Sequence, residues 1–142
     1  MKLAIGTDGP ASNNALDMFR EMYLACVLQK LERQDAAACP AEGILYAACS
    51  GGARAMGLEN CDCLAEGKAA DLAVINMNRP NMRPVHAVAK NLVYSGTRDN
   101  VRLTMVAGRI LYENGEFFVG EDPGRIYAEA EKYTRELIGN GN

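Results

Sequence analysis

Apolar residues are spaced in two different ways along this chain, and the spacing changes near residue 58. Before that point they recur every three or four residues, which is typical of helices that pack on one face. After it, short apolar runs alternate with turn residues, which is typical of strands. The pattern therefore predicts a largely helical first segment and a mostly β second segment.

The first segment opens with a short apolar run, Leu3 to Ile5, which Gly6 ends. Such a run predicts a buried parallel strand that leads into the polar loop 7–14. The apolar positions that follow recur at helical spacing to about residue 31: Leu16, Phe19, Tyr23 and Val27. We expect a strand, a polar loop and a long helix in succession.

Two shorter helices are predicted next. One begins at Pro40 or Ala41, since proline is favoured in the first turn of a helix, and the stretch 49–52 should break it. The other runs through residues 53–56 and stops at Gly57, because glycine is a common left-handed helix terminator.

The second segment contains several short apolar runs, which predict strands over residues 64–67, 71–75, 91–95, 101–106 and 109–112. Asn114-Gly115 is a strong signal for a two-residue hairpin before Phe117. Asp122 and Pro123 then introduce a final amphipathic helix. Its apolar positions are Ile126, Tyr127, Ala130, Tyr133, Leu137 and Ile138.

Length and charge narrow the possible functions. The 142 residues are shorter than a complete (β/α)8 barrel, and 49% hydrophobic with 23% charged residues is typical of a globular protein. A net charge of −3 without a basic run argues against nucleic acid or an anionic membrane as partner. Since the sequence also contains neither a membrane-spanning run nor a signal peptide, we expect a cytoplasmic protein.

The chain has five cysteines, an odd number that does not resemble the disulfide framework of a small secreted domain. We therefore expect reduced thiols. Cys61 and Cys63 flank Asp62 and could form half of a zinc site. With no second pair and a single histidine in the chain, an incidental or structural role is favoured.

Asp8 is the first candidate for chemistry. A carboxylate that follows a buried strand, on a loop that opens toward a helix, is where α/β barrels place metal-binding and catalytic groups. Gly9 and Pro10 form a turn that would fix the carboxylate. On the local pattern alone, the favoured role of Asp8 is a simple cap of the loop or helix.

Residues 5–19, IGTDGPASNNALDMF, resemble the region around the eighth barrel strand of methylthioadenosine/S-adenosylhomocysteine deaminases and triazine chlorohydrolases in the amidohydrolase superfamily. The likeness continues in order through GARAMGL at 52–58 and the block 64–75 with its EGKAADL. Three further blocks complete it: 84–86, 91–95 and 101–115. The resemblance covers nearly the whole chain as one contiguous C-terminal piece.

This resemblance implies an α/β fold in three parts. Residues 1–58 would form the last β/α unit of a (β/α)8 metal-dependent hydrolase barrel. Residues 59–122 would form the C-terminal part of a composite β-sandwich domain, and residues 123–142 a C-terminal helix and tail. The remaining strands of such a sandwich come from the N-terminal part of the enzyme.

The resemblance also assigns roles to residues. Asp8 matches the aspartate that binds the catalytic divalent metal, Zn or Fe, and exchanges a proton with the attacking water. Ser12 and Asn13 border the same loop and are candidates for substrate binding, although with Asn14 they are also natural N-caps, which is the favoured role. His86 lies in a block that is not a metal-ligand motif, so we expect it to be structural.

The family's histidine ligands and catalytic Glu are missing from this sequence, so whether the chain alone is an enzyme stays open. We expect part of a metal-dependent aminohydrolase or chlorohydrolase that hydrolyses a C–N or C–Cl bond of a small purine-like or triazine-like substrate. Alone, the chain should be inactive and bind no metal tightly.

The expected partners are the missing N-terminal part of the same enzyme and further copies of the chain. A surface with Leu72, Val74, Leu92 and Val93 and the stripe from Leu16 to Val27 are the expected contact surfaces. The alternative hypothesis is a non-enzymatic oligomerising or complementing module derived from the fold.

Overall fold

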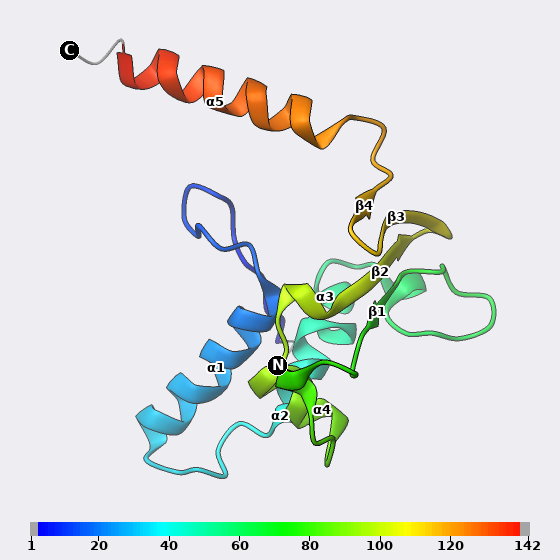
Figure 1. Ribbon diagram of the computed structural model, residues 1–142. Coiled ribbons are helices and arrows are strands. Elements are labelled where there is room, and N and C mark those ends of the chain that lie inside the picture. Colours follow the sequence, from blue (N-terminus) through cyan, green and yellow to red (C-terminus); the bar gives the residue numbers. More distant parts are fainter. Residues whose placement is uncertain (1–2, 140–142) are drawn as a thin grey trace.

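The computed structural model describes residues 3–139, in which helices form one body and a small sheet lies beside it (Figure 1). The α-helices are α1 (Met18–Arg33), α2 (Ala41–Ala48), α3 (Ser50–Ala55), α4 (Val88–Ser95) and α5 (Pro123–Gly139). Three short 3-10 helices are η1 (Glu59–Cys61), η2 (Pro80–Met82) and η3 (Arg98–Asn100). The strands are β1 (Leu72–Ile75), β2 (Val101–Val106), β3 (Arg109–Glu113) and β4 (Glu116–Phe117).

Helix α1 confirms the long helix predicted from apolar spacing, but its cap differs from the predicted one. Asp17 is the N-cap, and its Oδ1 accepts from the backbone N–H of Phe19 at 3.0 Å and of Arg20 at 3.4 Å. The prediction of Ser12, Asn13 or Asn14 as the cap was wrong, because these residues belong to a turn that precedes the helix. The helix ends at Gln34, which has left-handed backbone angles.

Helices α2 and α3 follow almost without interruption. Pro40 is the N-cap of α2, as the sequence predicted, and Gly57 has a φ of 75° just after α3. The predicted break is confirmed at Cys49, yet the chain becomes helical again at Ser50 and includes both glycines of the stretch. The break is therefore one residue long rather than four.

The core lies where α1, α2 and α4 pack against one another. Its buried cluster contains Met22 and Cys26 from α1, Ala41 and Ile44 from α2, and Val93 from α4. Residues 91–95 were predicted as a strand, and this prediction was wrong because they belong to α4. A five-residue apolar run cannot be assigned by periodicity alone, and here packing of Val93 against the other two helices decides its conformation.

The sheet is an antiparallel meander in the order β1-β2-β3-β4. Both tight connections use residues with positive φ: Ala107 at 49° and Gly108 at 77°, then Asn114 at 49° and Gly115 at 100°. Such pairs of left-handed residues suit two-residue hairpins, whose twist matches that of the strands. The predicted hairpin at Asn114-Gly115 and the strands around it are thus confirmed.

Two other predicted strands are wrong. Residues 3–7 and 64–67 have no strand assignment among the described residues. The backbone N–H of Ile5 donates instead to the carbonyl of Ala47 in α2, at 3.2 Å. An extended segment becomes a strand only when a neighbouring strand pairs with it, and no described strand pairs with residues 3–5.

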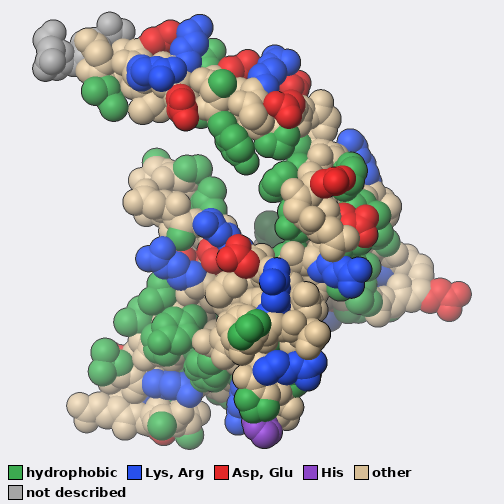
Figure 2. All heavy atoms as spheres, viewed as in Figure 1, with side chains coloured by type: hydrophobic (Ala, Val, Ile, Leu, Met, Phe, Trp, Pro, Cys, Tyr) green, Lys and Arg blue, Asp and Glu red, His purple; other side chains and the backbone are tan. Residues whose placement is uncertain are grey.

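Helix α5 extends away from the body of the chain (Figure 1). The structure describes all of its residues, and none of them is buried. In Figure 2 hydrophobic side chains gather along the side of α5 that faces the rest of the chain, across an open hollow. No helix within residues 3–139 is long and apolar enough to cross a membrane.

Candidate functional site

Asp8 lies in the exposed loop between residues 3–7 and α1. Its φ is 58°, a left-handed conformation that costs energy for a residue with a side chain, although less for aspartate than for most. Its Oδ1 accepts from the N–H of Gly9 at 2.8 Å, and its carbonyl accepts from the Thr7 hydroxyl at 3.1 Å. One carboxylate oxygen thus fixes the side chain to the turn, while Oδ2 remains available for a ligand.

The turn beyond Asp8 is closed by a single acceptor. The carbonyl of Gly9 accepts from the backbone N–H of Ser12 at 3.0 Å and of Asn13 at 2.9 Å. The Asn13 amide donates to Glu21 of α1 at 2.7 Å, and its Oδ1 accepts from the N–H of Ala15 at 3.0 Å. Asn13 therefore anchors the loop to α1, whereas Ser12, four residues after Asp8 on the same loop, is exposed.

The segment that carries Asp8 is held against the α2–α3 junction. A Cβ on Gly51 would lie 2.6 Å from the carbonyl oxygen of Leu3 and 3.1 Å from that of Tyr46. Contacts this short are incompatible with any side chain at position 51, so only glycine allows the two backbones to approach. The glycines at 51 and 52 were the sequence signal for this close approach, but the sequence analysis interpreted them only as helix breakers.

The described residues do not form a complete metal site. Within residues 3–139 there is no group of three or more His, Cys, Asp or Glu side chains placed to hold an ion. A catalytic zinc usually takes three protein ligands and a water, so Asp8 alone does not fit such a site. His86 is exposed in the 84–86 block and lines a different surface hollow with Lys90 and Tyr94.

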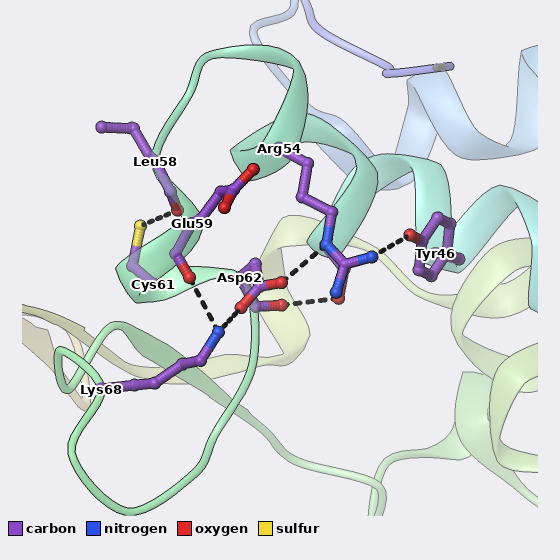
Figure 3. Close-up of polar contacts among 8 residues, drawn as sticks. Tyr46, Arg54, Leu58, Glu59, Cys61, Asp62 and Lys68 are labelled. Carbon is purple, nitrogen blue, oxygen red and sulfur yellow. Dashed lines mark hydrogen bonds and ion pairs between the residues drawn. The ribbon is translucent and has the colours of Figure 1, made fainter. Parts of the chain in front are cut away.

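The Cys61-Asp62-Cys63 turn has a role that the sequence did not reveal. Asp62 has only 3% of its side chain exposed and pairs with two cations, Arg54 from α3 and Lys68 from the following loop (Figure 3). The Arg54 Nε donates to Asp62 Oδ2 at 2.7 Å, and Arg54 also donates to the Tyr46 hydroxyl at 3.1 Å. Lys68 binds Asp62 Oδ1 and the carbonyl of Glu59.

These contacts change the protonation of the group. Two hydrogen bonds lower the pKa of Asp62 well below its ordinary value, and the one from Lys68 has a larger effect than the one from Arg54. Burial raises this pKa, but by less. The carboxylate stays charged and joins α3 to the start of the β segment. The cluster of Arg54, Asp62 and Lys68 therefore has a structural role, and the sequence pattern did not identify the two partners of Asp62.

The family model described as "Amidohydrolase family" matches residues 1–111. The chain belongs to the amidohydrolase family. It is 46% identical, over 115 residues, to a 5-methylthioadenosine/S-adenosylhomocysteine deaminase of Nitratidesulfovibrio vulgaris. The matched region is 81% of this chain and 26% of that deaminase.

Two solved members of this amidohydrolase group have the same backbone arrangement. An adenosine deaminase from Xanthomonas campestris with bound zinc superposes with a TM-score of 0.92 at 36% identity, over 98% of this chain and 32% of the other. An atrazine chlorohydrolase from Arthrobacter aurescens complexed with zinc gives 0.78 at 28% identity, over 87% of this chain and 28% of the other.

The expected resemblance is thus confirmed, and so is the α/β amidohydrolase fold. The chain spans between a quarter and a third of the length of these relatives. They include deaminases and chlorohydrolases, which hydrolyse C–N and C–Cl bonds, and two of them were crystallised with zinc. The assignments of Asp8, Ser12 and Asn13 remain predictions, as do the boundaries at residues 58 and 122.

Proposed function

We propose that this chain supplies the C-terminal part of a metal-dependent aminohydrolase, and that Asp8 is its one contribution to the reacting centre. The observation that carries the proposal is the fixed Asp8 carboxylate, whose Oδ1 is held by Gly9 at 2.8 Å on an exposed loop. The names of the relatives favour the C–N bond of an adenosine-type nucleoside as the bond that is hydrolysed. Triazine-like compounds are the second substrate class that we propose, because the chain is similar to an atrazine chlorohydrolase.

In this proposal Asp8 would be one of several ligands of a zinc or iron ion, which would lower the pKa of a bound water, and the Asp8 carboxylate would accept a proton from that water. The other ligands and the catalytic Glu come from a polypeptide that corresponds to the N-terminal two-thirds of the relatives. Residues 1–58 would then form the last β/α unit of the barrel, and residues 59–122, which include β1 to β4, would form part of a sandwich domain. Support comes from the superposition on relatives about three times as long.

Ser12 is proposed to contact substrate, because its side chain is exposed on the same loop as Asp8. Asn13 is proposed to position this loop in addition to any substrate contact, since its amide already binds Glu21. The proposed location is the cytoplasm. It is supported by the five cysteines, all of which lie in the described region and are free thiols.

The test is complementation. The chain is expressed with the N-terminal two-thirds of the 46%-identical deaminase, and ammonia release from 5-methylthioadenosine is measured. We expect activity with the wild-type chain and a fall in kcat/KM of at least about 100-fold with Asp8→Asn. Asparagine tolerates positive φ and can keep the bond to Gly9, so the variant removes charge with little effect on the loop.

The matched control is Asp99→Asn, which neutralises another exposed aspartate, at the η3 turn, and should leave kcat/KM unchanged. Equal activity of the Asp8→Asn and wild-type complexes, with co-purification proving assembly in both, would refute the role of Asp8.

A second candidate function is a non-enzymatic oligomerising or complementing module. One observation favours it, namely the exposed apolar side chains of α5, such as Leu137 at 78% and Ile138 at 72%, which are available to a partner. Co-purification with the N-terminal fragment in the absence of any deaminase activity would support this module over the enzyme.

A further inference from the structure

Cys26 lies in the core of the helical body and makes two polar contacts. It is on α1 and 0% exposed. Its Sγ lies 3.0 Å from the carbonyl oxygen of Cys39, to which the thiol donates, and 3.0 Å from the Tyr94 hydroxyl of α4. The thiol is therefore held in one orientation, directed at the backbone of a second cysteine.

Cys39 is partly exposed and sits in the segment that joins α1 to α2. Its φ is 57°, in the left-handed region, and it directly precedes Pro40. Burial raises the pKa of its thiol, the neighbouring Cys26 thiol raises it further, and Lys30 and Arg33 lower it. Of the two thiols, Cys39 is the one that a reagent in solution can reach.

The other three cysteines lie elsewhere. Cys49 is between α2 and α3, and Cys61 and Cys63 flank Asp62, where the Cys61 thiol donates to the carbonyl of Leu58 at 3.3 Å. Cys26 and Cys39 are thus a pair selected by the tertiary structure, although 12 residues separate them in the sequence.

We propose that Cys26 and Cys39 are an oxidisable dithiol, which a low-molecular-weight disulfide such as oxidised glutathione converts to an intramolecular disulfide. The Cys26 sulfur lies 3.0 Å from the carbonyl oxygen of Cys39, and its thiol is near enough to raise the pKa of the Cys39 thiol, so the two side chains are neighbours. A disulfide between them requires the Cys39 side chain to turn toward Cys26 and the backbone at Cys39 to adjust.

The chemistry proceeds by two exchanges. The Cys39 thiolate attacks the disulfide reagent, forms a mixed disulfide and releases one reagent thiolate. The Cys26 thiolate then attacks the Cys39 sulfur, forms the internal disulfide and releases the second reagent thiolate. Two protons pass from the cysteines to the two released thiolates, so two protein thiols are oxidised and one reagent disulfide is reduced to two thiols.

The product joins the middle of α1 to the residue before α2. It removes the Cys26 S–H and with it the hydrogen bond to the Cys39 carbonyl, and it shifts the sulfur that accepts from the Tyr94 hydroxyl of α4. The modification therefore adds a covalent link between α1 and the residue before α2 and changes the contact between α1 and α4.

The test uses the full chain with Cys49, Cys61 and Cys63 replaced by serine and with oxidised glutathione as the probe. Intact mass follows the mixed disulfide and its loss, and peptide mapping without reductant locates the bond. We expect an internal disulfide between Cys26 and Cys39 that closes at least about tenfold faster in the folded chain than in urea, because the fold holds the thiols together. With Cys26→Ser added, glutathione should remain attached to Cys39.

A mixed disulfide that persists on the folded chain with both cysteines present would overturn the proposal, as would closure at the same rate in urea. If the triple serine variant fails to fold, the unmodified chain is oxidised and mapped instead. A bond between Cys26 and Cys39 that dominates over bonds to Cys49 supports the proposal, and the reverse order refutes it.

Discussion

At the scale of single residues, two adjacent glycines of α3 have different surroundings. A Cβ at Gly51 would press on the carbonyl of Leu3 at 2.6 Å, whereas a Cβ at Gly52 would meet only the carbonyl of Ala47 at an ordinary 3.7 Å. Both positions gain helix propensity on replacement by alanine. Alanine substitutions at the two positions therefore distinguish the effect of packing against the segment that carries Asp8 from the effect of helix propensity.

We predict that Gly51→Ala destabilises the chain by about 1–3 kcal/mol through overpacking, and that it displaces residues 3–8. Gly52→Ala should be neutral, or stabilising by up to about 1 kcal/mol, since its space is free. Urea unfolding of both variants measures this difference. If Gly51→Ala is as stable as Gly52→Ala, the close approach of Leu3 to α3 does not exist in solution.

The charged cluster around Asp62 leads to a pH prediction. The pKa of Asp62 is held below its ordinary value of 3.8 by Lys68 and Arg54, so the unfolded chain binds a proton at higher pH than the folded chain does. The stability that this group contributes is complete above about pH 4 to 5. It is lost as the pH falls below the unfolded value toward the folded one.

We predict that Asp62→Asn lowers the melting temperature by several degrees at pH 7 and flattens its decline below pH 4. Melting curves between pH 3 and pH 7 check this, with Asp35→Asn, an exposed aspartate in the loop after α1, as control. An acid dependence that is identical in Asp62→Asn and wild type would show that the cluster does not contribute to folding.

At the scale of elements, α5 is the amphipathic helix that the sequence predicted, but none of its residues is buried. Its helix spans Pro123–Gly139, the Asp122 side chain accepts from the N–H of Arg125 at 2.9 Å, and i,i+4 ion pairs such as Arg125 with Glu129 support it. Its apolar side chains are nevertheless exposed, with Leu137 at 78% and Ile126 at 47%. An unburied amphipathic stripe of this kind invites association.

We predict that deleting residues 121–142 leaves the melting temperature of the remaining chain unchanged, because no described residue of α5 is buried. The same deletion should reduce the self-association that we propose for the full chain, as measured by light scattering at low micromolar concentration. Leu137→Glu, a single change on the apolar stripe, should act in the same direction. A monomeric full-length chain would contradict the proposed homo-oligomer.

The contact surface proposed from the sequence needs correction. Leu92 and Val93 were grouped with Leu72 and Val74 on one face of a sheet, but they belong to α4, where Val93 is 0% exposed. Val74 on β1 remains exposed at 43%. The described sheet has two open edges, because β1 pairs only with β2 and β4 only with β3.

At the scale of the whole molecule, Asp8 is one carboxylate on a chain that spans about a third of its relatives. Affinity for a divalent ion depends on several ligands with fixed geometry. We predict that the isolated chain retains less than one equivalent of zinc after dialysis, and that Asp8→Ala changes this amount little. Tight stoichiometric zinc in elemental analysis, abolished by Asp8→Ala, would show that the chain completes a site by itself.

The sequence by itself determined the features that depend on local order. Apolar spacing predicted α1 and α5, Pro40 predicted the start of α2, and Asn114-Gly115 predicted the hairpin between β3 and β4, because these features are decided by neighbouring residues. The fifteen-residue block around Asp8 was enough to indicate the amidohydrolase family, which the family match to residues 1–111 bears out.

Only the tertiary structure decided the rest. Residues 91–95 are helical because Val93 packs between α1 and α2, and residues 3–5 form no strand because no described strand pairs with them. The ion pairs of Asp62 with Arg54 and Lys68 join separate elements of the fold. The hydrogen bond from the Cys26 thiol to the Cys39 carbonyl does so as well. Pairing and burial depend on which surfaces meet, and a local pattern does not contain that information.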